Sequence, residues 1–160
     1  MKKLEGFAIV TGSSRGLGRE MVLRCAADGH DVVVNYTSGK SKDAAEAVAA
    51  EAREKYGRRA LVIKADVSKY DECKAMMAQA SEYFGERLAI LVANAGIKNL
   101  LDFDELSHED YERVINVNLM GVMHAVHCAI PYMKDGKGGS IIMLSSIAGQ
   151  MGPAKRVDYS

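Results

Sequence analysis

Short apolar runs alternate with longer helix-like stretches along the whole chain, and this alternation restricts the possible folds more than any other feature. Each run is rich in β-branched residues and has few polar positions. Such runs are typical of strands that are buried on both faces of a parallel sheet. The predicted strands are Phe7–Val10, Asp31–Tyr36, Arg59–Ala65, Leu88–Ala93 and Ser140–Leu144.

The stretches between these strands carry the start and stop signals of helices. A stop signal, Asp28-Gly29, follows residues 17–27. Ser41 is expected to cap a helix rich in Ala and Glu that ends at Gly57. Patterns typical of capping boxes precede the later helices. Ser68 with Asp71 precedes a helix that ends at Gly85. Ser107 with Asp110 precedes a stretch that reaches about Lys134, and Pro131 is expected to end or kink this helix.

The resulting order of elements is β-α-β-α-β-α-β-α-β. This order predicts an α/β fold, a Rossmann-like doubly wound parallel sheet with helices on both faces in three layers. No internal repeat, low-complexity segment or linker interrupts the pattern. Residues 1–160 are therefore predicted to form a single domain.

A glycine-rich segment joins the first predicted strand to the first predicted helix. Its glycines, Gly12, Gly16 and Gly18, have the spacing GxxxGxG. Gly12 permits a tight turn, Gly16 permits close approach of a diphosphate, and Gly18 permits the helix to pack tightly on the strand. Glycines alone often only make turns, but at a helix N-terminus they expose backbone N–H groups to a phosphate-bearing ligand.

With this loop the sequence resembles the short-chain dehydrogenase/reductase family, whose glycine motif is TGxxxGxG. Further matches follow in order along the whole chain. Asp66-Val67 stands where family members hold the adenine ring, and Asn94-Ala95-Gly96 resembles the family's NNAG motif with Ala93 in place of the first Asn. The catalytic positions of the family are matched by Asn118, Ser146 and Tyr159. Tyr159 lies 13 residues after Ser146, as in the family.

The resemblance implies a nicotinamide dinucleotide site and a catalytic set. The cofactor-binding residues that it implies are Gly12, Ser14, Arg15, Gly16, Leu17, Gly18, Thr37, Asp66, Val67, Asn94, Ala95 and Gly96. By the same resemblance, Tyr159 transfers the proton, Ser146 orients the carbonyl or hydroxyl group and Asn118 holds a water in a proton relay. The alternatives are a locally bonded Asn118, a Ser146 that ends a strand and an ordinary terminal Tyr159.

The end of the second predicted strand bears on the choice of cofactor. An acidic residue there normally binds the ribose 2′-hydroxyl of NAD, but the segment Asn35-Tyr36-Thr37-Ser38 contains no carboxylate. Arg15 in the glycine loop, with the small Thr37 and Ser38, suits a 2′-phosphate. The sequence therefore favours NADP(H) over NAD(H); the alternative is that Arg15 is a solvated surface residue.

The family pattern extends past the last residue of this sequence. Family members have a lysine four positions after the catalytic tyrosine, which lowers the tyrosine pKa, and then further strands, helices and a substrate loop. The sequence ends at Ser160. We therefore expect the 160-residue chain to be catalytically incomplete, and the fifth predicted strand to leave an apolar sheet edge open.

The substrate implied by the resemblance is a small-molecule or acyl-thioester carbonyl or secondary alcohol, with activity like that of 3-oxoacyl-carrier-protein reductases as the default. A non-catalytic dinucleotide-binding or interaction module is the alternative. A methyltransferase also has a glycine-rich first turn, but it explains neither Asn118, Ser146 nor Tyr159. Family members form dimers or tetramers through their fourth and fifth helices, so a homo-oligomer is expected.

Charge and cysteine usage limit the partners and the compartment. The 21 basic and 21 acidic residues balance, which argues against nucleic acid or an anionic membrane surface. Three scattered cysteines, Cys25, Cys73 and Cys128, are typical of reduced core thiols. Glu5 and the residues near Gly12 interrupt any signal-peptide pattern, and no apolar run exceeds a strand in length, so a cytoplasmic protein is predicted. His124 and His127 lack a third ligand nearby, and no metal site is predicted.

Overall fold

The computed structural model describes residues 4–134 and 137–160. Five parallel strands form one sheet in the order β3-β2-β1-β4-β5. The strands are β1 (Phe7–Val10), β2 (Val32–Tyr36), β3 (Ala60–Lys64), β4 (Leu88–Ala93) and β5 (Ser140–Met143). All five predicted strands are confirmed, and each predicted end lies within one residue of the observed end.

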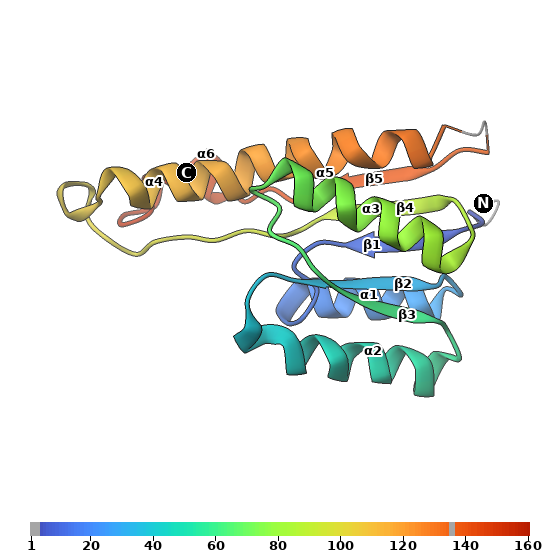
Figure 1. Cartoon of the computed structure of the whole chain (residues 1–160). Coiled ribbons are helices and arrows are strands. Elements are labelled where there is room, and N and C mark those ends of the chain that lie inside the picture. Colours follow the sequence, from blue (N-terminus) through green and yellow to red (C-terminus); the bar gives the residue numbers. More distant parts are fainter. Residues whose placement is uncertain (1–3, 135–136) are drawn as a thin grey trace.

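Helices cover both faces of the sheet, which gives the predicted three layers (Figure 1). On one face lie α1 (Gly16–Ala27) and α2 (Lys42–Tyr56), and on the other lie α3 (Tyr70–Phe84) and α5 (Gly121–Ala129). The remaining helical segments are α4 (His108–Ile115), a π-helical turn at Asn116–Met120, α6 (Ala148–Met151) and short 3-10 turns at Gly39–Ser41, Phe103–Glu105 and Ile130–Tyr132. The fold is Rossmann-like.

The first strand shows why its sequence does not alternate between apolar and polar residues. All four residues of β1 are fully buried. Phe7 and Ile9 belong to the core cluster under α3 and α5, whereas Ala8 and Val10 belong to the cluster under α1 and α2. Because both faces are covered, each side chain must be apolar.

Two of the predicted helix caps are wrong. Ser41 precedes α2, but its hydroxyl donates to the Ser38 carbonyl (2.9 Å) and does not cap the helix. The Ser68 hydroxyl donates to the Asp66 carboxylate (2.7 Å), and α3 begins at Tyr70. In both places a nearby acceptor outside the helix competes for the hydroxyl. The capping box of Ser107 and Asp110 at the start of α4 is confirmed.

The long predicted helix before Lys134 is composite. It runs through α4, the π-helical turn and α5, and it ends in the 3-10 turn that contains Pro131. By length and composition alone, the 25-residue segment His108–Tyr132 could cross a membrane. The lack of a long uninterrupted apolar run in the sequence therefore does not exclude a membrane-spanning helix. Core helices pass the same test, and α5 packs on α3 and β4.

The order of the strands reverses direction beside the central strand β1. The chain passes from β1 outward through β2 and β3, then returns to β4 on the other side of β1. Such a reversal opens a crevice at the carboxyl ends of the strands, where ligands bind in open α/β sheets. At the far end of the sheet β5 is an edge strand, and Ile142 and Met143 are 46% and 62% exposed, as expected for an open apolar edge.

Candidate functional site

A cavity of about 920 Å³ lies at the crevice beside β1. It is lined by segments that follow β1, β2, β3 and β4, together with residues of α4. All twelve residues predicted to bind the cofactor line it, namely Gly12, Ser14, Arg15, Gly16, Leu17, Gly18, Thr37, Asp66, Val67, Asn94, Ala95 and Gly96. Residues that are far apart in sequence thus meet around one space.

The glycine loop has a backbone that side chains would disturb. Gly12 and Gly16 adopt φ values of +65° and +57°, in the left-handed region that glycine enters without strain. No atom lies within 4 Å of the place where a Cβ of Gly16 would stand, so this part of the loop faces open space. A Cβ at Gly18 would lie 2.5 Å from the Gly12 carbonyl oxygen and 2.6 Å from Asn94 Nδ2, which shows how closely α1 starts against the loop.

Asn35, a residue that sequence reasoning did not select, supports this loop from within the sheet. It is 1% exposed, and its Oδ1 accepts the Gly12 N–H (2.9 Å). Its Nδ2 donates to the carbonyls of Ile63 (3.3 Å) and Ala65 (3.1 Å). The backbone groups of Asn35 bond with Ser13 as well. The loop is therefore tied to the ends of β2 and β3 by one buried amide.

The other side of the loop is tied to the end of β4. The Thr11 hydroxyl accepts the N–H groups of Asn94 and Ala95, both at 3.0 Å. Asn94 Nδ2 donates to the Thr11 carbonyl (2.8 Å). The Asn94 amide thus holds the loop in place, and the predicted motif Asn94-Ala95-Gly96 has a structural task as well as a place at the cavity.

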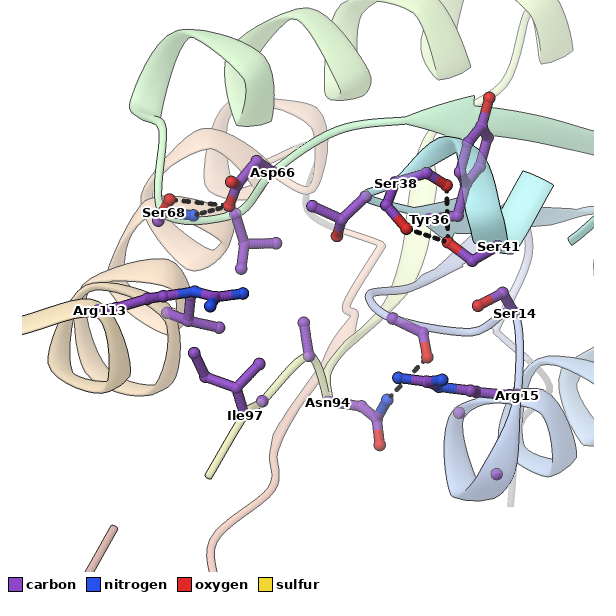
Figure 2. Close-up of a pocket in the computed structure, with 18 of the residues that line it drawn as sticks. Ser14, Arg15, Tyr36, Ser38, Ser41, Asp66, Ser68, Asn94, Ile97 and Arg113 are labelled. Atoms are coloured by element: carbon purple, nitrogen blue, oxygen red, sulfur yellow. Dashed lines mark hydrogen bonds between the residues drawn. The ribbon is translucent and has the colours of Figure 1, made fainter. Parts of the chain in front are cut away.

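Cationic side chains stand at both ends of the cavity. Figure 2 shows Arg15 and Arg113 reaching toward each other from opposite sides. Lys40 also lines the cavity, near Ser38 and Ser41. Neither the Arg15 nor the Arg113 side chain makes a hydrogen bond or ion pair with a described residue. Lys40, Ser41 and Arg113 were not selected from the sequence, since no motif marks them.

Asp66 borders the same cavity and has a fixed orientation. Its Oδ1 accepts the N–H (3.0 Å) and the hydroxyl (2.7 Å) of Ser68, and Figure 2 shows both bonds. Its backbone N–H donates to the Glu72 carboxylate (2.7 Å). These bonds fix the turn between β3 and α3 in front of the cavity.

A second pocket of about 470 Å³ adjoins the first, since both are lined by Leu17, Asn94, Ala95, Gly96 and Ile97. This second pocket contains all three predicted catalytic residues, Asn118, Ser146 and Tyr159, along with Lys98. The candidate catalytic side chains therefore open onto the continuation of the nucleotide-sized cavity.

Asn118 lies in the π-helical turn between α4 and α5. Its Oδ1 accepts the Ile97 N–H (2.8 Å), and its Nδ2 donates to the Ile97 carbonyl (2.8 Å). A π-helical turn inside a helix is frequent at functional sites. Here it carries an amide that fixes the segment after β4.

The segment that carries Tyr159 is tied to the segment after β4. Asn99 Nδ2 donates to the Asp158 carboxylate (2.8 Å), and Lys155 pairs with Asp102 (2.9 Å). The Ser146 hydroxyl accepts the Ala148 N–H at the start of α6 (3.2 Å). Tyr159 is half-buried. These contacts bring the last residues of the chain back to the pocket.

Two histidines and two cysteines lie where α3 packs against α5 and the turn before α3. His124 Nδ1 donates to the Val67 carbonyl (3.0 Å), and the His127 ring bonds to the Tyr70 hydroxyl (3.0 Å). Cys73 and Cys128 are buried, as predicted, whereas Cys25 is half-buried. Burial raises the pKa of the Cys73 thiol to about 12, so it is a poor nucleophile at neutral pH.

Comparison with known proteins assigns the family. A family model described as short chain dehydrogenase matches residues 6–160. The 3-oxoacyl-[acyl-carrier-protein] reductase FabG of Staphylococcus aureus is 39% identical over 157 residues, which are 98% of this chain and 62% of the relative. The corresponding reductase of Synechocystis is 38% identical over 153 residues, 96% of this chain and 60% of the relative.

A solved structure agrees with these sequence matches. A crystal structure from Sinorhizobium meliloti 1021, assigned to the short-chain alcohol dehydrogenases, superposes with a TM-score of 0.89 at 29% identity and covers 98% of this chain and 60% of that chain. The chain thus spans about three fifths of the length of these relatives. Because the family model covers nearly every residue, the chain belongs to the short-chain dehydrogenase family.

Proposed function

We propose that this chain supplies the dinucleotide site and three catalytic side chains of an oxidoreductase that interconverts a carbonyl and a secondary alcohol. One observation carries the proposal. The cavity lined by the glycine loop continues into the pocket lined by Asn118, Ser146 and Tyr159. A cofactor held in the first cavity would place its reactive end among these three side chains.

The residues around the first cavity fit a nicotinamide dinucleotide. The open space at Gly16 and the backbone N–H groups at the start of α1 suit a diphosphate, which needs N–H donors at a helix N-terminus. Thr37, Asp66, Val67 and the segment Asn94-Ala95-Gly96 would hold the rest of the dinucleotide. When bound, this cofactor supplies the hydride.

The three polar side chains of the second pocket suit proton transfer at an oxygen. Tyr159 would donate a proton to the carbonyl oxygen on reduction and accept it on oxidation. Ser146 would hydrogen-bond the same oxygen and orient it. Asn118, whose amide already holds Ile97, would position the water through which the proton exchanges with solvent.

NADP(H) is the proposed cofactor form. Arg15 and Lys40 bring two cations to the part of the cavity that also contains the hydroxyls of Ser38 and Ser41. The segment that follows β2 lines this part of the cavity with Thr37, Ser38, Lys40 and Ser41, and none of these residues is a carboxylate. A 2′-phosphate would find charge-assisted donors there.

The proposed substrate class rests on the names of two relatives, and the proposed assembly rests on the surface of this chain. Two relatives are named 3-oxoacyl-[acyl-carrier-protein] reductases, so an acyl-thioester carbonyl is the proposed substrate class. The exposed apolar side chains Ile115, Leu119 and Met123 on the α4–α5 segment support a homo-oligomer. Residues 1–160 are proposed to form one NAD(P)-binding domain of a cytoplasmic protein that has no nucleic-acid or membrane partner.

Two measurements test the proposal. First, the 160-residue chain is titrated with NADPH. Second, turnover of a 3-oxoacyl thioester is measured by nicotinamide absorbance with the protein that the full native reading frame encodes. Tyr159→Phe is expected to lower turnover at least about 100-fold and to leave the NADPH dissociation constant unchanged. Turnover that Tyr159→Phe does not lower would contradict the catalytic assignment and favour a non-catalytic binding module.

A further inference from the structure

Arg113 differs from most arginines in the part of the chain that the structure describes, because its guanidinium, like that of Arg15, has no partner there. Arg58 and Arg59 both pair with the buried Asp31, and Arg19 pairs with Glu51. The Arg113 side chain makes no hydrogen bond or ion pair with any residue in the ranges 4–134 and 137–160, although Glu109 lies one helical turn before it.

The structure aims this unpaired cation into the nucleotide-sized cavity. In Figure 2, Arg113 reaches from α4 into the space between Asp66 and Ser68 on one side and Ile97 on the other. Its neighbour Val114 is 1% exposed and anchors this turn of α4 in the protein interior. The helix start is fixed by the Ser107 capping box, so the backbone position of Arg113 beside the cavity follows from a capped helix.

The position of Arg113 separates it from the phosphate-binding part of the cavity. Arg15 and the glycine loop stand on the opposite side, and Figure 2 shows the two guanidinium groups facing each other across the space. The walls near Arg113 combine the apolar side chains of Val67 and Ile97 with the carboxylate of Asp66 and acidic side chains of α4. The carboxylates disfavour a phosphate there, whereas the apolar side chains and the flat face of the guanidinium suit an aromatic ring.

We propose that Arg113 contacts the adenine base of the bound dinucleotide and stacks its guanidinium plane on the ring. This inference rests on the proposed function, because it assumes that a dinucleotide occupies the cavity. A guanidinium is weakly hydrated and planar, so it stacks on aromatic rings and on nucleic-acid bases more readily than an ammonium does. Arg113 is then a determinant of adenine affinity that acts separately from Arg15.

The experiment compares two mononucleotides that differ in the base. Binding of 5′-AMP and of nicotinamide mononucleotide is measured by NMR titration for the unchanged chain, Arg113→Met and Arg113→Lys. Both substitutions are expected to weaken 5′-AMP binding about tenfold and to leave nicotinamide mononucleotide binding within about twofold. Arg24→Met, at an exposed arginine of α1 paired with Asp28, is the matched control and is expected to change neither affinity.

Each other outcome overturns the inference. If Arg113→Lys keeps full 5′-AMP affinity, or if both mononucleotides weaken equally, Arg113 acts through charge and not through the base. If Arg113→Met leaves 5′-AMP binding unchanged while NADPH still binds, only this inference fails. If the unchanged chain binds neither NADPH nor 5′-AMP, the proposed function fails with it.

Discussion

Asn35 connects three backbone segments that define the nucleotide cavity. Its buried amide accepts from Gly12 and donates to Ile63 and Ala65. Truncation would leave these groups without a partner in a region where Asn35 itself is 1% exposed. An unsatisfied buried polar group costs about 1–3 kcal/mol.

We therefore expect Asn35→Ala to lower the free energy of unfolding by about 2 kcal/mol or more, measured by urea denaturation. Asn35→Asp keeps the acceptor for Gly12 but turns a carboxylate oxygen toward the Ile63 and Ala65 carbonyls, so it should destabilise at least as much. An unchanged urea midpoint for either variant would show that the loop does not depend on this amide.

Single residues differ in how well the sequence predicted them. Gly12, Gly16 and Gly18 could be predicted because their backbone demands are local to the loop. Asn35 and Arg113 could not, since their importance depends on segments that only the folded chain brings together. The predicted cofactor-binding and catalytic residues line two adjoining pockets, which agrees with the sequence motifs. The roles of these residues stay predictions.

At the scale of elements, some helix starts could be predicted from the sequence and others could not. Ser107 and Ser41 both precede helices, yet only Ser107 accepts a helix N–H, from Asp110. The Ser41 hydroxyl is used by Ser38. Strands and helices could be predicted from hydrophobic patterns because burial on both faces leaves a strong local signal. The caps at Ser41 and Ser68 could not, because an acceptor two or three residues earlier in the chain competes with the helix for the hydroxyl.

Ser107→Ala should lower the free energy of unfolding by about 1 kcal/mol, the usual contribution of a helix N-cap, and Ser41→Ala should change it by less. Hydrogen bonds from Ser107 lower the pKa of Asp110 below its usual value of 3.8. The part of the capping contribution that depends on the ionised Asp110 carboxylate is thus present above pH 3.8 and is lost as the pH falls through the lowered pKa.

Urea denaturation of both variants at neutral and acidic pH checks this expectation. The difference between the unchanged chain and Ser107→Ala should shrink as the pH drops. A difference that stays constant, or an equal loss for Ser41→Ala, would contradict the assignment of the cap.

At the scale of the whole molecule, topology explains why one cavity can serve nucleotide binding and catalysis. β1 stands between β2 and β4, so the loops that follow these strands meet at the same edge. The composite helix from α4 to α5 then carries Arg113 to the first pocket and Asn118 to the second. The parallel sheet could be predicted from the β-α-β pattern, whereas the strand order and the π-helical turn that places Asn118 could not.

The central claim is that this cavity binds a nicotinamide dinucleotide and prefers the phosphorylated form. The most direct test is the dissociation constant of the 160-residue chain for NADPH and for NADH, measured by calorimetric titration. NADPH is expected to bind about tenfold more tightly or better, and Arg15→Met is expected to remove most of that difference. Tighter binding of NADH, or no saturable binding of either dinucleotide, would contradict the account.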